Sequence, residues 1–185
     1  EEFGNTLIEK TQEVQVLVNN AGGALGVDTV LEGKDEDWET MFQTNVLGLL
    51  RVSRKVIPLM LKTEGALVIN VGSIAGRVAY EGGSAYCGAK AAELQISKAL
   101  RLELCGSPVR VTSLDPGMAE TDFSLVRYKG DEKKAKEVYR GLEPLRAEDI
   151  AETMLWLAER PAHVCVDELV IKPTAQAAPH KVFRQ

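Results

Sequence analysis

The chain has 185 residues, of which 45% are hydrophobic and 26% are charged, and its formal net charge is −5. This composition is ordinary for one globular domain, and the negative charge argues against nucleic acid or an anionic membrane surface as the main partner. No apolar run in the sequence approaches the roughly 18 residues that span a bilayer, and no signal-peptide pattern is present. We therefore expect a cytoplasmic protein that acts without nucleic acid or membrane.

The cysteines and histidines show no pattern of a metal site or of a disulfide framework. Cys87, Cys105 and Cys165 are odd in number, far apart and set in apolar contexts, so we expect reduced residues that pack in the interior. His163 and His180 lack the spacing of metal ligands. The sequence therefore predicts no metal centre.

The periodicity of apolar residues predicts strands that alternate with helices along the chain. The first strand, Val14–Gly23, ends in Asn and Gly and is expected to be buried on both faces. A long amphipathic helix follows with Asp35 as its N-cap, and the helix that begins at Ser84 is expected to end at Gly106. The predicted strands are 14–23, 65–76, 109–117 and 167–173, and the predicted helices are 35–61, 84–105, 127–140 and 148–160.

Strands separated by long helices indicate βαβ units, and hence an α/β protein whose doubly wound parallel sheet is covered by helices on both faces. No linker or repeat divides the chain, so residues 1–185 are expected to form one domain. In such sheets, ligands bind beyond the carboxyl ends of the strands. The sequences at these ends are NNAG, VGSIAG and DPGMAET, which are small or polar where each strand stops. We expect the chemistry of the protein to gather there.

Four residues near these strand ends could be combined in one site. Tyr86 and Lys90 lie about one helical turn apart, so their side chains would project side by side. Ser73 follows the second strand, where a serine is usually a hydrogen-bonding loop residue. Asn45 lies on the apolar stripe of its helix, where an amide needs buried partners. A structural and a functional role are equally open for Asn45.

Five short motifs then occur in the order and spacing of one family. They are N-N-A-G (Asn19 to Gly22), T-N-x-x-G (Thr44 to Gly48), G-S (Gly72 and Ser73), Y-x-x-x-K (Tyr86 to Lys90) and P-G-x-x-x-T (Pro116 to Thr121). One such motif is weak evidence, but five in order are strong. The sequence resembles the short-chain dehydrogenases/reductases, which are NAD(P)-dependent oxidoreductases on a Rossmann-type sheet. It is most similar to their NADP-dependent 3-hydroxy acid dehydrogenases, which include serine 3-dehydrogenase and L-allo-threonine dehydrogenase types.

The resemblance implies a role for each matching residue. Tyr86 would be the general acid/base, Lys90 would lower the pKa of its phenol and hold the cofactor ribose, and Ser73 would bind the substrate oxygen. Asn45 would hold a water that links Lys90 to solvent, which completes a catalytic set of four. Ser73 and Tyr86 would contact the substrate. The residues implied in cofactor binding are Asn20, Ala21, Gly22, Tyr86, Lys90, Pro116, Gly117, Met118 and Thr121.

The same resemblance implies the reaction and its cofactor. The cofactor would be NADP, with NAD as the alternative. A hydride would pass between its nicotinamide and a secondary alcohol or carbonyl. The substrate would be a small 3-hydroxy acid or a related hydroxy or keto compound.

The sequence departs from the family in one large respect. The glycine-rich loop T-G-x-x-x-G-x-G, which holds the pyrophosphate in the family, does not occur in the 185 residues. By comparison with the family, about sixty residues with three strands are missing, so the chain corresponds to the C-terminal, catalytic part of the fold. We expect the 185 residues alone to bind neither NAD nor NADP measurably and to be inactive. We also expect four parallel strands, the first of which lacks a neighbour on one side.

Two other functions stay open at this point. One is a truncated, cofactor-free relative that acts as a binding or interaction module. The missing loop favours this alternative, whereas the intact set of Asn45, Ser73, Tyr86 and Lys90 favours an enzyme. The other is an extended relative such as a sugar-nucleotide epimerase, which would need a larger C-terminal substrate domain than the residues after Thr121 supply.

The sequence says less about the substrate and the oligomeric state. The loop 79–83 and the segment after Thr121 are expected to line the substrate pocket. Arg77 and Arg127 are candidates to bind a carboxylate, although a solvated surface position is commoner for arginine. The two long helices, 35–61 and 84–105, carry more apolar and small residues than one sheet face can cover. We therefore expect a homodimer or a homotetramer.

Overall fold

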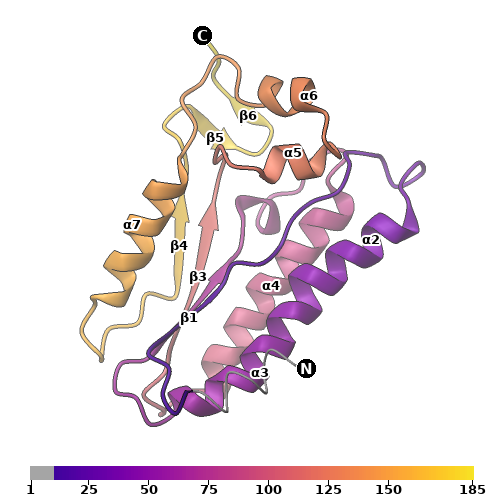
Figure 1. The fold of residues 1–185 in the computed structure, drawn as a ribbon. Coiled ribbons are helices and arrows are strands. Elements are labelled where there is room, and N and C mark those ends of the chain that lie inside the picture. Colours follow the sequence, from indigo (N-terminus) through magenta and orange to yellow (C-terminus); the bar gives the residue numbers. More distant parts are fainter. Residues whose placement is uncertain (1–10) are drawn as a thin grey trace.

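A four-stranded parallel sheet forms the centre of the protein in the computed structural model, which describes residues 11–185. The strands lie side by side in the order of the chain, as β1-β2-β3-β4, so the expectation of four parallel strands is confirmed (Figure 1). They are β1 (Val16–Asn19), β2 (Leu67–Val71), β3 (Arg110–Pro116) and β4 (Glu168–Ile171). Each crossover contains a helix, which gives the α/β architecture that the sequence predicted.

Helices cover both faces of the sheet because successive side chains of each strand point in opposite directions. On one face, Val68 of β2 packs against α3 (Leu49–Met60) in a core cluster that also contains Val111 of β3. On the other face, Leu67 and Ile69 pack against α7 (Ala147–Ala158). Figure 1 shows α7 on one side of the strands and the helices α2 to α4 on the other. A central strand buried on both faces therefore requires the nearly continuous apolar sequence LVINV.

The first strand is less buried than the sequence predicted. Val16 and Val18 are 43% and 39% exposed, whereas the neighbouring β2 is buried along most of its length. Within residues 11–185, β1 pairs with β2 alone, so its other edge has no strand beside it. The expectation that the first strand lacks a neighbour on one side is therefore confirmed for the described residues. The expectation of burial on both faces is wrong for the face that carries Val16 and Val18, whereas Leu17 packs against the core cluster of α3.

The long helix after β1 is continuous but not uniform. It contains α2 (Asp35–Phe42), a π-helical stretch (Gln43–Gly48) and α3, in place of the one regular helix predicted. The N-cap position is Lys34, which makes no capping bond through its side chain, so the prediction of Asp35 as N-cap is wrong by one residue. π-Helical insertions in α-helices occur often at functional sites. Asn45 lies inside this insertion and is its buried residue.

The next helix, α4 (Ser84–Glu103), matches the prediction closely. It ends just before Gly106, whose φ of 87° lies in the left-handed region that glycine adopts without strain. The helix carries both Tyr86 and Lys90 among its buried residues. Its buried face also includes Glu93 and Ser97, so this helix brings an unusual number of polar side chains to the sheet.

The charged segment 127–140 does not form the single helix that the sequence predicted. Two short helices, α5 (Phe123–Arg127) and α6 (Glu132–Glu137), are separated at Lys129 and Gly130, whose φ angles of 54° and 92° are left-handed. A left-handed residue ends a right-handed helix, which explains the interruption. The C-terminal residues add a small antiparallel hairpin of β5 (Gln176–Ala178) and β6 (Lys181–Val182), which the sequence did not predict.

The three cysteines differ in their surroundings. Cys87 is buried beside Tyr86, as expected, but Cys105 and Cys165 are exposed, so the prediction of three interior cysteines is wrong for two of them. All three are free thiols.

Among residues 11–185, no group of three or more His, Cys, Asp or Glu side chains is arranged to hold a metal ion. In the same residues, no helix combines the length and the apolar character that crossing a membrane requires.

Candidate active site

A cavity of about 1200 Å³ lies beyond the carboxyl ends of the strands. It extends from the sheet to α5, α6 and the β5–β6 hairpin. The residues predicted from the sequence that line it are Asn20, Gly22, Ser73, Tyr86, Lys90, Pro116, Gly117, Met118 and Thr121. Ala21 and Asn45 are the two predicted site residues that do not line it. The fold therefore brings residues from four separated segments to one space, at the position where parallel sheets bind ligands.

Tyr86 lies at the wall of this cavity and is almost fully buried, with 8% of its surface exposed. Burial raises the pKa of its phenol to about 12, and the neighbouring Ser73 side chain offsets part of that rise. The ring packs against Phe123 of α5, with ring centroids 5.6 Å apart. Its phenol is therefore protonated at neutral pH in the absence of a ligand.

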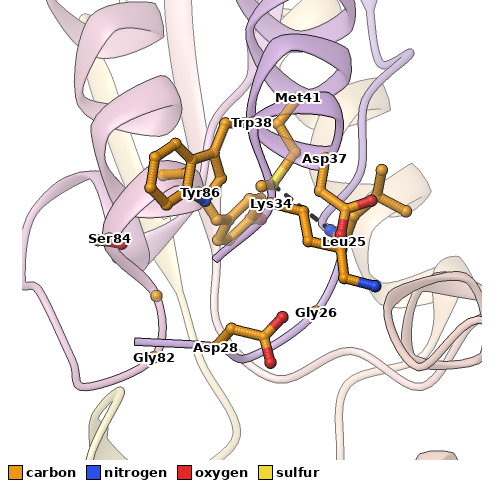
Figure 2. Close-up of a pocket in the computed structure, with 12 residues that line it drawn as sticks. Leu25, Gly26, Asp28, Lys34, Asp37, Trp38, Met41, Gly82, Ser84 and Tyr86 are labelled. Carbon is orange, nitrogen blue, oxygen red and sulfur yellow. Dashed lines mark hydrogen bonds between the residues drawn. The ribbon is translucent and has the colours of Figure 1, made fainter. Parts of the chain in front are cut away.

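The opposite side of the Tyr86 ring is filled by protein. Trp38 and Met41 of α2 pack with Tyr86, and all three line a second, small pocket (Figure 2). The Met41 sulfur accepts a hydrogen bond from Leu25 N at 3.4 Å, which ties the loop after β1 to the same helix. The remaining space there is about 10 Å³, too small for more than one water. Tyr86 is thus held on this side and opens only toward the large cavity.

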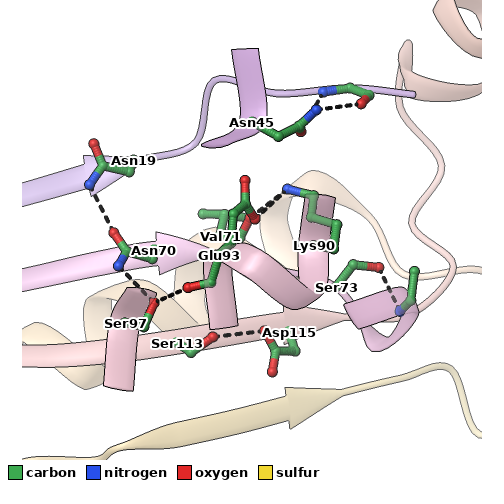
Figure 3. A network of polar contacts seen from close by, with 12 residues as sticks. Asn19, Asn45, Asn70, Val71, Ser73, Lys90, Glu93, Ser97, Ser113 and Asp115 are labelled. Carbon is green, nitrogen blue, oxygen red and sulfur yellow. Dashed lines mark hydrogen bonds and ion pairs between the residues drawn. The ribbon is translucent and has the colours of Figure 1, made fainter. Parts of the chain in front are cut away.

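Lys90 lies one helical turn after Tyr86, and its ammonium is fixed by two acceptors. Nζ donates to the backbone carbonyl of Val71 at 3.0 Å and to Glu93 Oε2 at 2.8 Å (Figure 3). It lies 5.9 Å from the centroid of the Tyr86 ring. Because Val71 is the last residue of β2, the first of these bonds connects α4 to the end of that strand. A positive charge is thereby held close to the phenol.

Ser73 combines the ordinary structural role of its position with access to the cavity. Its backbone is extended, and Oγ accepts a hydrogen bond from Ala75 N at 3.1 Å, which caps the short 3₁₀ helix η2 (Ile74–Gly76). The same side chain acts on the pKa of Tyr86, so the two hydroxyls lie near each other. The cap fixes the orientation of Ser73 without using its hydroxyl proton, which stays available to an acceptor.

The buried amide of Asn45 is satisfied by hydrogen bonds to the backbone. It has no exposed surface, and its amide is paired with both the N–H and the carbonyl of Gly23, at 3.1 and 3.0 Å. Nδ2 also donates to Met41 O at 2.7 Å. A Cβ on Gly22 would lie 2.4 Å from Asn45 Oδ1, so only glycine fits there. Asn45 thus fastens the loop after β1, including the N-N-A-G residues, to the helix.

The floor near Pro116 depends on a residue that the sequence reasoning missed. Gln176 of β5 is buried and accepts a hydrogen bond from Met118 N at 2.8 Å through Oε1. The same oxygen would be 2.3 Å from a Cβ on Gly117, so that position also requires glycine. The sequence around Gln176 does not predict this contact, because Met118 and Gln176 are far apart in the chain and meet only in the fold.

The two arginines considered for carboxylate binding have different surroundings. Arg77 does not line the cavity and is paired with Asp115, through Nε at 2.6 Å, and with Glu168. Its guanidinium joins the loop after β2 to β3 and β4, so the structure assigns it to an ion-pair network and not to a ligand. Arg127 lines the cavity, with Cζ 5.4 Å from the Tyr80 ring and 5.8 Å from the Tyr86 ring. Its Nε donates to Gly26 O at 3.1 Å.

Comparison with known proteins identifies the family. The model of the short chain dehydrogenase family matches residues 1–131. The chain belongs to the short-chain dehydrogenase family. Over 180 residues it is 42% identical to the NADP-dependent 3-hydroxy acid dehydrogenase of Schizosaccharomyces pombe, a match that covers 97% of the chain and 70% of that protein. The resemblance stated from the sequence motifs is therefore confirmed.

Other relatives agree with this assignment. The sulfoacetaldehyde reductase of Chromohalobacter salexigens is 45% identical over 172 residues, which are 92% of this chain and 68% of that protein. Among solved structures, the closed form of serine dehydrogenase complexed with NADP⁺ superimposes with a TM-score of 0.88 at 42% identity, covering 94% of this chain and 71% of that one. These relatives are named as oxidoreductases, and they give no support to the alternative of a non-enzymatic binding module.

We predict that replacing Arg77 by Gln lowers the free energy of unfolding by about 2 kcal/mol, because the buried Asp115 carboxylate loses its charged partner. Urea denaturation of the two proteins measures the difference. Replacing Arg140, which pairs with Glu137 at the surface, by Gln is the matched control and should change stability by less than about 0.5 kcal/mol. Equal stability of the wild type and the Arg77 variant would contradict the structural role.

Proposed function

We propose that the protein is an NADP-dependent oxidoreductase that transfers a hydride between the nicotinamide and a small hydroxy or keto acid. The observation that carries the proposal is the convergence of Tyr86, Lys90 and Ser73 on one cavity beyond the strand ends. The names of the relatives support the choice of NADP over NAD. When bound, the cofactor supplies or accepts the hydride, and the protein positions the reacting groups around it.

The cavity is suited to hold the nicotinamide part of a dinucleotide. Its volume of about 1200 Å³ leaves room for a cofactor and a small substrate together. On one side, Asn20 and Gly22, which line the cavity, would approach the adenosine ribose, and the glycine allows close contact with the backbone. On the other, the segment from Pro116 to Met118 together with Thr121 would bind the carboxamide of the nicotinamide. Lys90 would hold the adjoining ribose.

Tyr86 is assigned the transfer of the proton. Since burial raises the pKa of its phenol to about 12, Tyr86 starts as a proton donor, which is the form that reduction of a carbonyl needs. In the opposite direction the phenol must lose its proton to accept one from an alcohol. The Lys90 ammonium, held 5.9 Å from the ring, favours that phenolate. Ser73 would donate its free hydroxyl proton to the same substrate oxygen and stabilise the charge that develops there.

Arg127 is assigned the recognition of an anionic group on the substrate. The names of the relatives include a 3-hydroxy acid, serine and sulfoacetaldehyde, which all carry an acidic group close to the reacting carbon. Arg127 lines the cavity beside Tyr86, and its hydrogen bond to Gly26 O uses Nε and not a terminal nitrogen of the guanidinium. A planar guanidinium binds a carboxylate or a sulfonate through two hydrogen bonds.

Replacing Tyr86 by Phe should lower turnover of the full-length protein by about two orders of magnitude or more, because the proton donor is lost while the ring remains. Steady-state kinetics with NADP and serine or 3-hydroxypropionate measures the effect. Folding should change little, since only a hydroxyl at the cavity wall is removed, and a thermal melt checks this. Turnover like that of the wild type would refute the assignment of Tyr86.

Replacing Arg127 by Gln should raise KM for an anionic substrate about ten- to a hundredfold, because a charged hydrogen-bond pair is lost. KM for an uncharged secondary alcohol of similar size should change much less, which separates substrate recognition from the effect of Arg127 on Tyr86. Replacing Arg127 by Lys keeps the charge without the planar pair of donors, and an intermediate KM is expected. An equal change in KM for both substrates would argue against recognition of the anion.

Self-association is proposed on the basis of apolar side chains that the helices leave exposed. Phe42 and Leu50, on the helix after β1, are 41% and 42% exposed, and Leu102 of α4 is also exposed. Such surface is typical of an interface between copies. We expect a homodimer or homotetramer by light scattering at micromolar concentration, and replacing Phe42 and Leu50 together by Glu should shift it toward the monomer. A wild-type monomer would contradict the proposal.

A further inference from the structure

Glu93 is a buried carboxylate that none of the steps above uses. It lies on α4, one turn after Lys90 and two turns after Tyr86, with 3% of its surface exposed. Its Oε2 accepts a hydrogen bond from Lys90 Nζ at 2.8 Å (Figure 3). Removing a carboxylate from water is costly, and a buried ion pair is weak as a source of stability. Packing alone therefore gives no reason for an acidic residue at this position.

The contacts of Lys90 show what Glu93 determines. An ammonium has three N–H groups. Two of them are directed to Val71 O and Glu93 Oε2, on the side of the sheet and of the following helical turn. In the described part of the chain these are the acceptors of Lys90, so one N–H is left for the cavity that Lys90 lines. Glu93 thus fixes both the place of Nζ and the direction of its remaining donor.

We propose that Glu93 is a positioning residue that holds the Lys90 ammonium beside Tyr86 and whose charge sets how strongly that ammonium favours the Tyr86 phenolate. This inference rests on the proposed oxidoreductase function. When Glu93 is neutral, the phenol experiences the full positive charge of Lys90. When Glu93 is ionised, its negative charge cancels part of that field, and the pKa of Tyr86 is higher.

The groups around Glu93 make its charge sensitive to pH near neutrality. Burial raises the pKa of Glu93 to about 7, Lys90 opposes that rise, and Asp115 of β3 adds to it. Asp115 is itself paired with Arg77, and Tyr86 and Lys90 face Glu93 from its own helix. Because the pKa of the carboxyl is raised, Glu93 is neutral below pH about 7 and ionised above it. Its ionisation therefore opposes that of Tyr86 in the range where alcohol oxidation requires the phenolate.

Replacing Glu93 by Gln tests the proposal in the full-length protein. The amide oxygen can still accept the hydrogen bond from Lys90, so the position of Nζ is kept while the negative charge is removed. The dependence of kcat/KM on pH is measured for alcohol oxidation with NADP⁺, where the acidic limb reports the ionisation of Tyr86. We expect that limb to move to lower pH by about 0.5–1 unit in the variant.

Three further proteins make the result specific. Glu103→Gln removes an exposed carboxylate from the same helix and should leave the profile unchanged. Ser97→Ala removes the bond from Ser97 to the backbone carbonyl of Glu93, and should lower stability without moving the limb. Glu93→Met removes the charge and the acceptor together, so Lys90 is no longer held beside Tyr86. KM for NADP⁺ should then rise, and the acidic limb should lie at higher pH than in Glu93→Gln, because the phenolate loses part of the stabilisation by the ammonium.

The outcomes separate this inference from the proposed function. If a folded Glu93→Gln protein has the wild-type limb, or a folded Glu93→Met protein has both the wild-type limb and the wild-type KM for NADP⁺, Glu93 neither tunes Tyr86 nor holds Lys90. The inference is then overturned, although the oxidoreductase function stands. If thermal melts show that both variants fail to fold, Glu93 is a structural residue and the inference is again overturned. Absence of any NADP-dependent activity in the wild type would refute the proposed function itself.

Discussion

The hydrogen bond from Lys90 to the carbonyl of Val71 is the contact on which the geometry of the site depends. The hydrogen bonds of the sheet fix the position of the last carbonyl of a strand, and the backbone of a helix fixes where its side chains begin. The position of the helix relative to the strand, however, needs a contact between the two. This one bond joins the end of β2 to the second turn of α4. Tyr86, one turn earlier on the same helix, therefore has a fixed distance from the strand ends where Gly22, Ser73 and Gly117 lie.

A series of hydrogen-bonded polar side chains connects the same strand and helix a second time. Asn70 of β2 accepts a hydrogen bond from Asn19 of β1 at 2.8 Å and donates to Ser97 of α4 at 2.8 Å (Figure 3). Ser97 in turn donates to the backbone carbonyl of Glu93. Each polar group in this series would be costly to bury alone, and each is satisfied by the next. Two strands and a helix are thereby held in one register, which apolar packing specifies less strictly.

The sequence predicted those features that depend on residues close together in the chain. Four parallel strands follow from the apolar runs, and the proximity of Tyr86 and Lys90 follows from the helical repeat. The ion pairing of Arg77, the contact of Gln176 with Met118 and the exposed face of β1 at Val16 and Val18 depend on distant segments, so no local pattern contained them. Glu93 is intermediate: its spacing of three from Lys90 was visible in the sequence, but its burial, which makes the pair chemically unusual, was not.

The two sides of the cavity are attached to the protein in different ways. The floor consists of strand ends and α4, where glycines and buried polar groups leave little freedom for other residues. The cover, which consists of α5, α6 and the β5–β6 hairpin, is fastened in part through main-chain carbonyls, since Arg184 donates to the carbonyls of Arg140 and Val138, and Gln185 N to that of Gly141. Main-chain carbonyls persist whatever side chain a residue carries. Positions 138, 140 and 141 of the cover can therefore change their side chains without losing these contacts, while the glycines and buried polar groups of the floor are constrained.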